Sequence, residues 1–160
     1  MRKSGILMHI SSLPSPYGIG SFGAEAWRFV DFLAAGGQRF WQVLPLSPTG
    51  FGDSPYQSCS AFAGNPYFID LDLLREAGLL ENEDYVNLNW GADPCRVDYA
   101  LLYTQRFSVL RKAAARFDAQ ADPDFARFCA GEAAWLDDYA LFMALKDAHG
   151  GAAWTQWERP

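Results

Sequence analysis

Residues 5–44 read GILMHISSLPSPYGIGSFGAEAWRFVDFLAAGGQRFWQVL, and this stretch decides the fold class. Its two ends, Gly5–Ile10 and Arg39–Leu44, are short apolar runs typical of buried strands. Between them, apolar side chains recur at helical spacing until Gly36–Gly37 ends the helix: Ala26, Phe29, Val30 and Leu33. A strand, a helix and a strand within about 40 residues predict a βαβ unit and therefore a parallel sheet of the α/β class.

The loop that follows the second strand holds the strongest functional signal. Its core, Gly52–Pro66, reads GDSPYQSCSAFAGNP, and loops of this length in compact domains are usually functional or disordered. Closely spaced aromatic residues argue against disorder: Phe51, Tyr56 and Phe62. Ligand sites of α/β proteins lie at the carboxyl ends of strands, where this loop starts. The loop mixes flat apolar faces with polar groups, as sugar binding requires, from Asp53, Ser54, Tyr56, Gln57, Ser58 and Asn65. Equally, Asp53 and Ser54 could only shape turns while Phe62 anchors the loop.

The rest of the chain has a helical pattern. A short helix is predicted over Leu71–Gly78, another over Pro123–Ala130, and a longer one over Glu132–Ala148. The long helix before them has one apolar face over five turns: Val97, Leu101, Thr104, Phe107, Leu110, Ala114 and Phe117. Because two parallel strands cannot bury both faces of a sheet, we expect part of a larger α/β protein with a helical insertion.

Composition excludes several functions. The net charge of −6 disfavours nucleic acid as a partner. The three cysteines, Cys59, Cys95 and Cys129, form no CxxC pair, so neither a zinc site nor a disulfide framework is expected. No apolar run approaches a membrane span. We expect a cytoplasmic protein that uses no metal or cofactor and does not bind membranes.

A second motif, GIGSFG at Gly18–Gly23, satisfies the dinucleotide pattern G-x-G-x-x-G. Its first glycine lies eight residues after Ile10, where the strand is expected to end, whereas a dinucleotide loop starts directly after its strand. The second strand and its exit also carry no acidic residue for a ribose hydroxyl. Nucleotide binding is therefore disfavoured, and the glycines are interpreted as a turn before the helix.

The carboxylates give no catalytic pair. Glycosyl transfer with retention needs two carboxyl groups about 5–5.5 Å apart. The closely spaced candidates are interpreted as helix caps or solvated surface: Asp70 and Asp72, Glu81 and Glu83, Asp137 and Asp138. His9, at the end of the first strand, could line a pocket or serve a structural role.

Three segments resemble glycoside hydrolase family 77, the 4-α-glucanotransferases of the amylomaltase type. They are HISSLPSPYGIGSFG (9–23), QVLPLSPTGFGDSPYQSCSAFAGNPYFIDL (42–71) and WLDDYALFMALKDAHGG (135–151). The resemblance implies the first two strands of a (β/α)8 TIM barrel. It assigns residues 1–73 to the start of that barrel. Residues 74–160 would be a helix-rich inserted subdomain, incomplete at its C-terminal side.

The resemblance also implies an activity. The family transfers α-1,4-glucan segments from maltooligosaccharides to the 4-hydroxyl of an acceptor such as glucose or maltose, by retaining double displacement. The catalytic Asp, Glu and Asp are expected beyond Pro160, so no catalytic residue is assigned here. A non-catalytic carbohydrate-binding or regulatory module is the alternative.

The binding positions carried over by the resemblance lie mostly in the loop. Tyr56 would stack on a sugar, and Asp53 and Ser54 would border the acceptor side. Phe51 and Tyr103 would form a secondary glucan site. Phe51 stands where the family often has tyrosine, so it keeps a stacking face without the hydroxyl.

Overall fold

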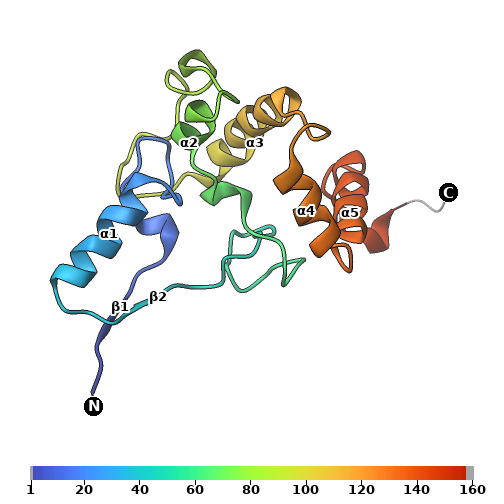
Figure 1. The fold of residues 1–160 in the computed structure, drawn as a ribbon. Coiled ribbons are helices and arrows are strands. Elements are labelled where there is room, and N and C mark those ends of the chain that lie inside the picture. Colours follow the sequence, from blue (N-terminus) through green and yellow to red (C-terminus); the bar gives the residue numbers. More distant parts are fainter. Residues whose placement is uncertain (1, 158–160) are drawn as a thin grey trace. The chain divides into compact units, whose positions relative to one another are not determined.

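The computed structural model describes residues 2–157 (Figure 1). Contacts divide the chain into two compact units, Met1–Phe117 and Asp118–Pro160, and each is described by itself. The expected division into barrel and inserted subdomain at residue 73 concerns a different boundary and stays a prediction.

The first unit contains the expected βαβ unit. Strand β1 (Gly5–Leu7) pairs in parallel with β2 (Phe40–Gln42), and helix α1 (Ala24–Ala35) connects them (Figure 1). The register aligns Gly5 with Phe40, Ile6 with Trp41 and Leu7 with Gln42, which confirms the predicted parallel pairing. Both strands are shorter than predicted. A 3-10 turn, η1 (Ile10–Ser12), follows β1, because the sequence SSLP favours turns over an extended chain.

The sheet itself is not the core of this unit. All three residues of β1 are exposed, and in β2 only Trp41 is half-buried. Helix α1 buries Ala26 and Leu33 but exposes Val30, which the sequence placed on its apolar face. Parallel strands are normally covered on both faces by other elements. The exposed apolar side chains of β1 and β2 resemble those of a protein interior, but no element among the described residues covers them.

The core lies instead where loops pack on the long helix. Four further elements follow β2: η2 (Pro66–Phe68), α2 (Leu71–Glu76), η3 (Asn82–Asp84) and α3 (Tyr99–Arg116). Their buried side chains meet those of the β1–α1 loop in one cluster, which includes Ile10, Leu13, Ile19, Phe68, Leu71, Leu80, Tyr85, Leu102 and Val109. The cluster fixes the two loops that leave the carboxyl ends of β1 and β2.

The most buried stripe of helix α3 differs from the predicted face, of which Phe107 and Leu110 are half-buried against the core. The buried residues are Leu102, Arg106, Val109 and Ala113, whereas Thr104 and Ala114 of the predicted face are exposed. The reason is Arg106. It lies on the buried stripe, but a prediction from apolar spacing does not count a charged residue as buried.

An ion cluster joins α3 to η3. The carboxylate of Asp84 accepts hydrogen bonds from Lys112 Nζ at 3.0 Å, from Arg116 Nη1 at 2.5 Å and from the backbone N–H of Glu81 at 3.0 Å. These donors, with Arg116 the strongest, hold the pKa of Asp84 well below its usual range.

Asp84→Asn should therefore lower the urea midpoint of unfolding at neutral pH. Because the pKa of Asp84 is lower in the folded state, its ionised carboxylate stabilises the folded protein fully at pH values above the unfolded-state pKa of about 3.9. This stabilisation is lost as the pH falls below that value. The difference between wild type and Asp84→Asn should thus be largest at pH 7 and shrink towards pH 2. Glu83→Gln, an exposed neighbour, is the control. A difference that does not change with pH would contradict the assignment.

The second unit is a small helical unit. It contains α4 (Pro123–Gly131), α5 (Leu136–Ala148) and the 3-10 turn η4 (Trp154–Gln156), so both predicted helices are confirmed, with α5 starting later than expected. Apolar side chains at helical spacing are half-buried at the start and along one face of α5: Trp135, Tyr139, Phe142 and Met143. At the end of α5, the His149 ring stacks on Trp157 at 4.9 Å. Across residues 2–157, no helix is long and apolar enough to cross a bilayer.

Candidate functional site

The candidate loop is closed by a short neck at the carboxyl end of β2. The backbone N–H of Asn65 donates to the carbonyl of Leu46 at 2.8 Å. The buried Asn65 side chain caps η2, because its Oδ1 accepts from the N–H of Tyr67 at 3.0 Å. The sequence had counted Asn65 among the sugar-binding groups, but the structure gives it this capping role. Residues 47–64 therefore project from a fixed base.

Inside the loop, short turns shape the backbone. The N–H of Gly50 donates to the carbonyl of Gln57 at 3.1 Å, and Ser54 Oγ accepts from the N–H of Tyr56 at 3.3 Å. Ser58 Oγ donates to the carbonyl of Ser60 at 2.8 Å. Ser54 thus has the turn-forming role considered from the sequence, while its other hydrogen-bonding capacity is available to a ligand.

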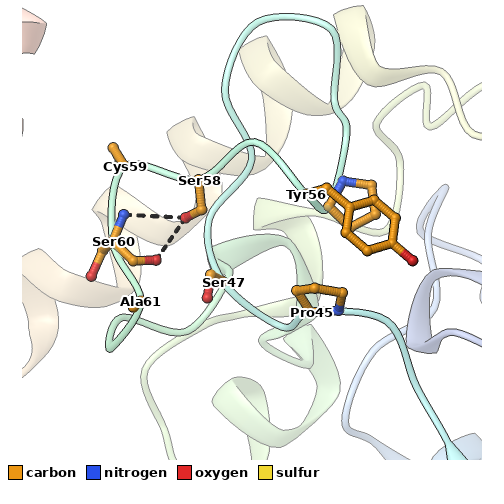
Figure 2. Close-up of a pocket in the computed structure, with 8 residues that line it drawn as sticks. Pro45, Ser47, Tyr56, Ser58, Cys59, Ser60 and Ala61 are labelled. Carbon is orange, nitrogen blue, oxygen red and sulfur yellow. Dashed lines mark hydrogen bonds between the residues drawn. The ribbon is translucent and has the colours of Figure 1, made fainter.

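These turns surround an open hollow of about 340 Å³. Figure 2 shows the Tyr56 ring on one side of the hollow and Ser58, Cys59 and Ser60 on the other. The hollow is lined by Pro45, Ser47, Pro55, Tyr56, Ser58, Cys59, Ser60 and Ala61. Tyr56 is 73% exposed, so its ring has a free face. Of the predicted binding groups, only Tyr56 and Ser58 line the hollow, whereas Asp53 and Ser54 do not. The other lining residues were not predicted, although their places beside the strand end and Tyr56 could have suggested them.

Asp53 has an unusual backbone. It is the only non-glycine residue with positive φ (55°) among residues 2–157, and it follows Gly52 at φ 94°. Asp tolerates this left-handed conformation better than most residues. Partial burial raises the pKa of the Asp53 carboxyl. The pKa of Tyr99 is also raised, mainly by burial and to a smaller extent by the negative charge of Asp53. Asp53 is thus a half-buried carboxylate close to Tyr67 and Tyr99, and it can accept a hydrogen bond from a ligand.

The two residues of the predicted secondary site are both exposed. Phe51 is fully exposed, and Tyr103 on α3 is 60% exposed. Tyr103 packs edge-on against Phe107 with 5.8 Å between ring centroids, and Phe107 lies 5.5 Å from Tyr67. Tyr103 thus lies off the buried stripe of α3, as a binding platform would require. Joint binding of a glucan by Phe51 and Tyr103 stays a prediction.

His9 braces the strand ends. Its Nδ1 accepts from the backbone N–H of Leu44 at 3.2 Å, one step beyond the backbone hydrogen bonds of the sheet, and its ring packs edge-on against Phe68 at 5.2 Å. Burial lowers the pKa of His9. A neutral ring that accepts at Nδ1 carries its proton on Nε2. The structural alternative for His9 therefore has direct support.

The glycines of GIGSFG serve close packing, and Asp70 serves as a helix cap. A Cβ on Gly20 would lie 2.0 Å from the carbonyl oxygen of Ile10, and one on Gly23 would lie 1.9 Å from Asp70. The glycines of GIGSFG thus allow close packing, as the turn interpretation expected. Asp70 caps α2 through the N–H of Leu73 at 3.0 Å and accepts from Ser21 Oγ at 2.5 Å.

Asp72 takes part in a network that the sequence did not reveal. Its carboxylate accepts from the hydroxyl of Tyr17 at 3.0 Å and from that of Tyr85 at 2.6 Å. Burial and this carboxylate raise the pKa of both phenols. No cluster of three or more His, Cys, Asp or Glu suited to a metal occurs in the described part of the chain.

Comparisons with known proteins show which family this chain resembles. A family model described as 4-alpha-glucanotransferase matches residues 8–160. The 4-alpha-glucanotransferases of Thermus thermophilus and of Streptococcus pneumoniae are 53% and 54% identical over 163 and 157 residues. These alignments cover 99% and 98% of this chain but 32% and 31% of the relatives.

A solved structure, amylomaltase from Streptococcus agalactiae in complex with acarbose, superposes with a TM-score of 0.91 at 48% identity, covering 99% of this chain and 32% of that one. The chain thus spans about a third of the length of the relatives it matches. It shows the same local fold as the corresponding third of that enzyme. The match of the family model over nearly all of its residues places the chain in the 4-alpha-glucanotransferase family.

Proposed function

We propose that this chain is part of a 4-α-glucanotransferase and forms one wall of its glucan-binding cleft. The whole reaction transfers α-1,4-glucan segments to the 4-hydroxyl of an acceptor such as glucose or maltose, by retaining double displacement. The observation that carries the proposal is the exposed Tyr56 ring beside an open hollow, on a loop anchored at the carboxyl end of β2.

The chemistry of this loop suits a sugar. One face of a glucose ring carries C–H groups, which pack on an aromatic ring, while its hydroxyls point outward to polar partners. Tyr56 offers the ring, and Asp53 and Ser54 lie two to three residues before it as acceptors. Partial desolvation of Asp53 strengthens a hydrogen bond from a sugar hydroxyl to its carboxylate.

We place the catalytic carboxylates outside this chain. Retention requires two carboxyl groups about 5–5.5 Å apart across the scissile bond. Asp70 and Asp72, the closely spaced carboxylates that follow the loop in sequence, already accept hydrogen bonds from Ser21 and from two tyrosines. We infer that residues 1–160 bind substrate, while the nucleophile, the acid/base group and the stabilising Asp belong to the other two thirds of the relatives' length.

The same division explains the exposed sheet. Strands β1 and β2 carry apolar side chains, yet nearly all of their residues are exposed. We propose that they are the first two strands of a (β/α)8 barrel, and that neighbouring strands cover them in the whole enzyme. Such a surface does not favour the alternative of a complete, non-catalytic carbohydrate-binding module.

A direct test is an assay of the 160-residue chain with maltotriose. We expect no glucose release above the background, because no carboxylate pair is available for the displacement. Addition of the complementary two thirds of a relative should restore transfer if the fragments associate. Appreciable glucose release by the 160-residue chain alone would show that the chemistry is wrongly placed.

A further inference from the structure

Arg106 is the most deeply buried charged residue of the first unit. It is 1% exposed and lies on α3 among apolar side chains: Leu102, Val109 and Ala113. Burial lowers its pKa to about 10, so the guanidinium still carries its charge at neutral pH. Because burying a charge without a paired counter-ion is costly, packing alone does not account for an arginine here.

The guanidinium is held by two backbone carbonyls from distant parts of the chain. Nη2 donates to the carbonyl of Ile69 at 2.5 Å, and Nη1 donates to that of Tyr17 at 3.4 Å. The Nε atom is buried, and no partner for it occurs within residues 2–157. The charge of nearby Asp70 favours the cation. An apolar side chain could fill the same space but would leave both carbonyls without a donor.

Both carbonyls belong to loops at the carboxyl end of the sheet. Tyr17 lies in the loop between β1 and α1, and Ile69 directly follows η2, which begins after the neck residue Asn65. The N–H of Phe22 also donates to the carbonyl of Phe68 at 2.9 Å, so the two loops touch next to the guanidinium. Arg106 therefore ties α3 to the base of both loops.

Electrostatics connect this cation to the candidate site. Burial, followed by the charge of Asp53, raises the pKa of Tyr67 to about 12, while the charge of Arg106 acts in the opposite direction. The Tyr67 phenol is thus close enough to sense both groups. The charges of Arg106 and Asp53 thus both act on Tyr67, which lies two residues after the neck residue Asn65.

We propose that Arg106 is a positioning residue for the glucan-binding loop, which holds the neck at Asn65 and the β1–α1 loop in one fixed arrangement through the carbonyls of Ile69 and Tyr17. It does not touch the sugar. That the loop binds a glucan rests on the proposed function, whereas the positioning of the neck does not.

The test compares Arg106→Met and Arg106→Lys with Arg39→Met, an exposed arginine of the first unit. Amide hydrogen exchange of the 160-residue protein is followed at the neck and in α1. We expect Arg106→Met to speed exchange at Asn65, Tyr67 and Phe68 by about tenfold or more, with α1 changed less than about twofold. Arg106→Lys should give an intermediate rate, since one ammonium can serve Ile69 but not both carbonyls. Arg39→Met should match wild type.

Equal acceleration of neck and α1 amides would mean a general loss of stability and would overturn the proposal, as would wild-type rates in Arg106→Met. If Arg106→Met does not fold, Arg106→Lys decides by the same comparison. In the wild type, NMR should show separate, slowly exchanging Nη proton signals for Arg106. A single averaged signal from a freely rotating guanidinium would contradict the fixed geometry.

Titration of the whole enzyme with maltoheptaose adds a separate readout. We expect the dissociation constant of Arg106→Met to rise about tenfold, in parallel with the faster exchange at the neck. If wild type does not bind maltoheptaose while the exchange results hold, the proposed function fails and the positioning role stands. If wild type binds and Arg106→Met binds equally well, the positioning role fails.

Discussion

Tyr56→Ala in the whole enzyme should lower kcat/KM for transfer between maltooligosaccharides by about 10- to 100-fold. Removal of the ring takes away the apolar platform and the stacking of one sugar, together worth about 1–3 kcal/mol, and each 1.4 kcal/mol is tenfold. The ring is 73% exposed and borders the hollow, so truncation leaves the core unchanged. The measurement is the initial rate of glucose release from maltotriose.

Two controls separate stacking from other effects. Tyr56→Phe keeps the ring and should stay within a few-fold of wild type. Tyr103→Ala removes an exposed aromatic residue from α3, which does not line the hollow, and should leave the rate with maltotriose nearly unchanged. Wild-type kinetics in Tyr56→Ala would remove this residue from the site.

Gly20→Ala should be among the most destabilising single substitutions in the first unit. The added Cβ would meet the carbonyl oxygen of Ile10 at 2.0 Å and the backbone nitrogen of Leu13 at 2.9 Å. Because these are backbone atoms of a 3-10 turn, no side chain can rotate away. Overpacking of this kind costs about 1–3 kcal/mol or more, which thermal unfolding would report as a clear fall in Tm.

The matched control for this prediction is Gly64→Ala. No atom lies within 4 Å of a Cβ at Gly64, and this glycine does not have a positive φ. Alanine there should be neutral or should stabilise by a few tenths of a kcal/mol, because it restricts the unfolded chain. Similar Tm values for the two variants would show that the loop around Gly20 relaxes freely.

The spacing of apolar residues and glycines along the sequence was sufficient to predict the elements that depend on neighbouring residues. The βαβ unit followed from two apolar runs, an amphipathic segment and the Gly36–Gly37 stop, and the structure has it in the expected parallel pairing. The candidate loop was located because ligand loops follow strand ends. The turn at GIGSFG was recognised from a spacing that does not suit a nucleotide.

What the sequence could not supply were contacts between distant polar residues. Tyr17 and Asp72 are 55 positions apart, and no periodicity links them. Arg106 shifted the buried face of α3 because a rule based on apolar residues places arginine outside. Asn65 was interpreted as a ligand-binding amide, but its side chain caps η2 by accepting from the N–H of Tyr67. This cap depends on the path of the backbone after Asn65, which the sequence does not reveal.

The closed neck of the loop has a consequence for protein engineering. The backbone bond from Asn65 to Leu46 and the Asn65 cap do not depend on the side chains of residues 47–64. The exposed residues of this segment can therefore be exchanged as a cassette while the anchoring points and the buried Pro48 and Ala63 are kept. Libraries confined to this cassette are expected to change how the loop binds sugars while the stability of the first unit is retained.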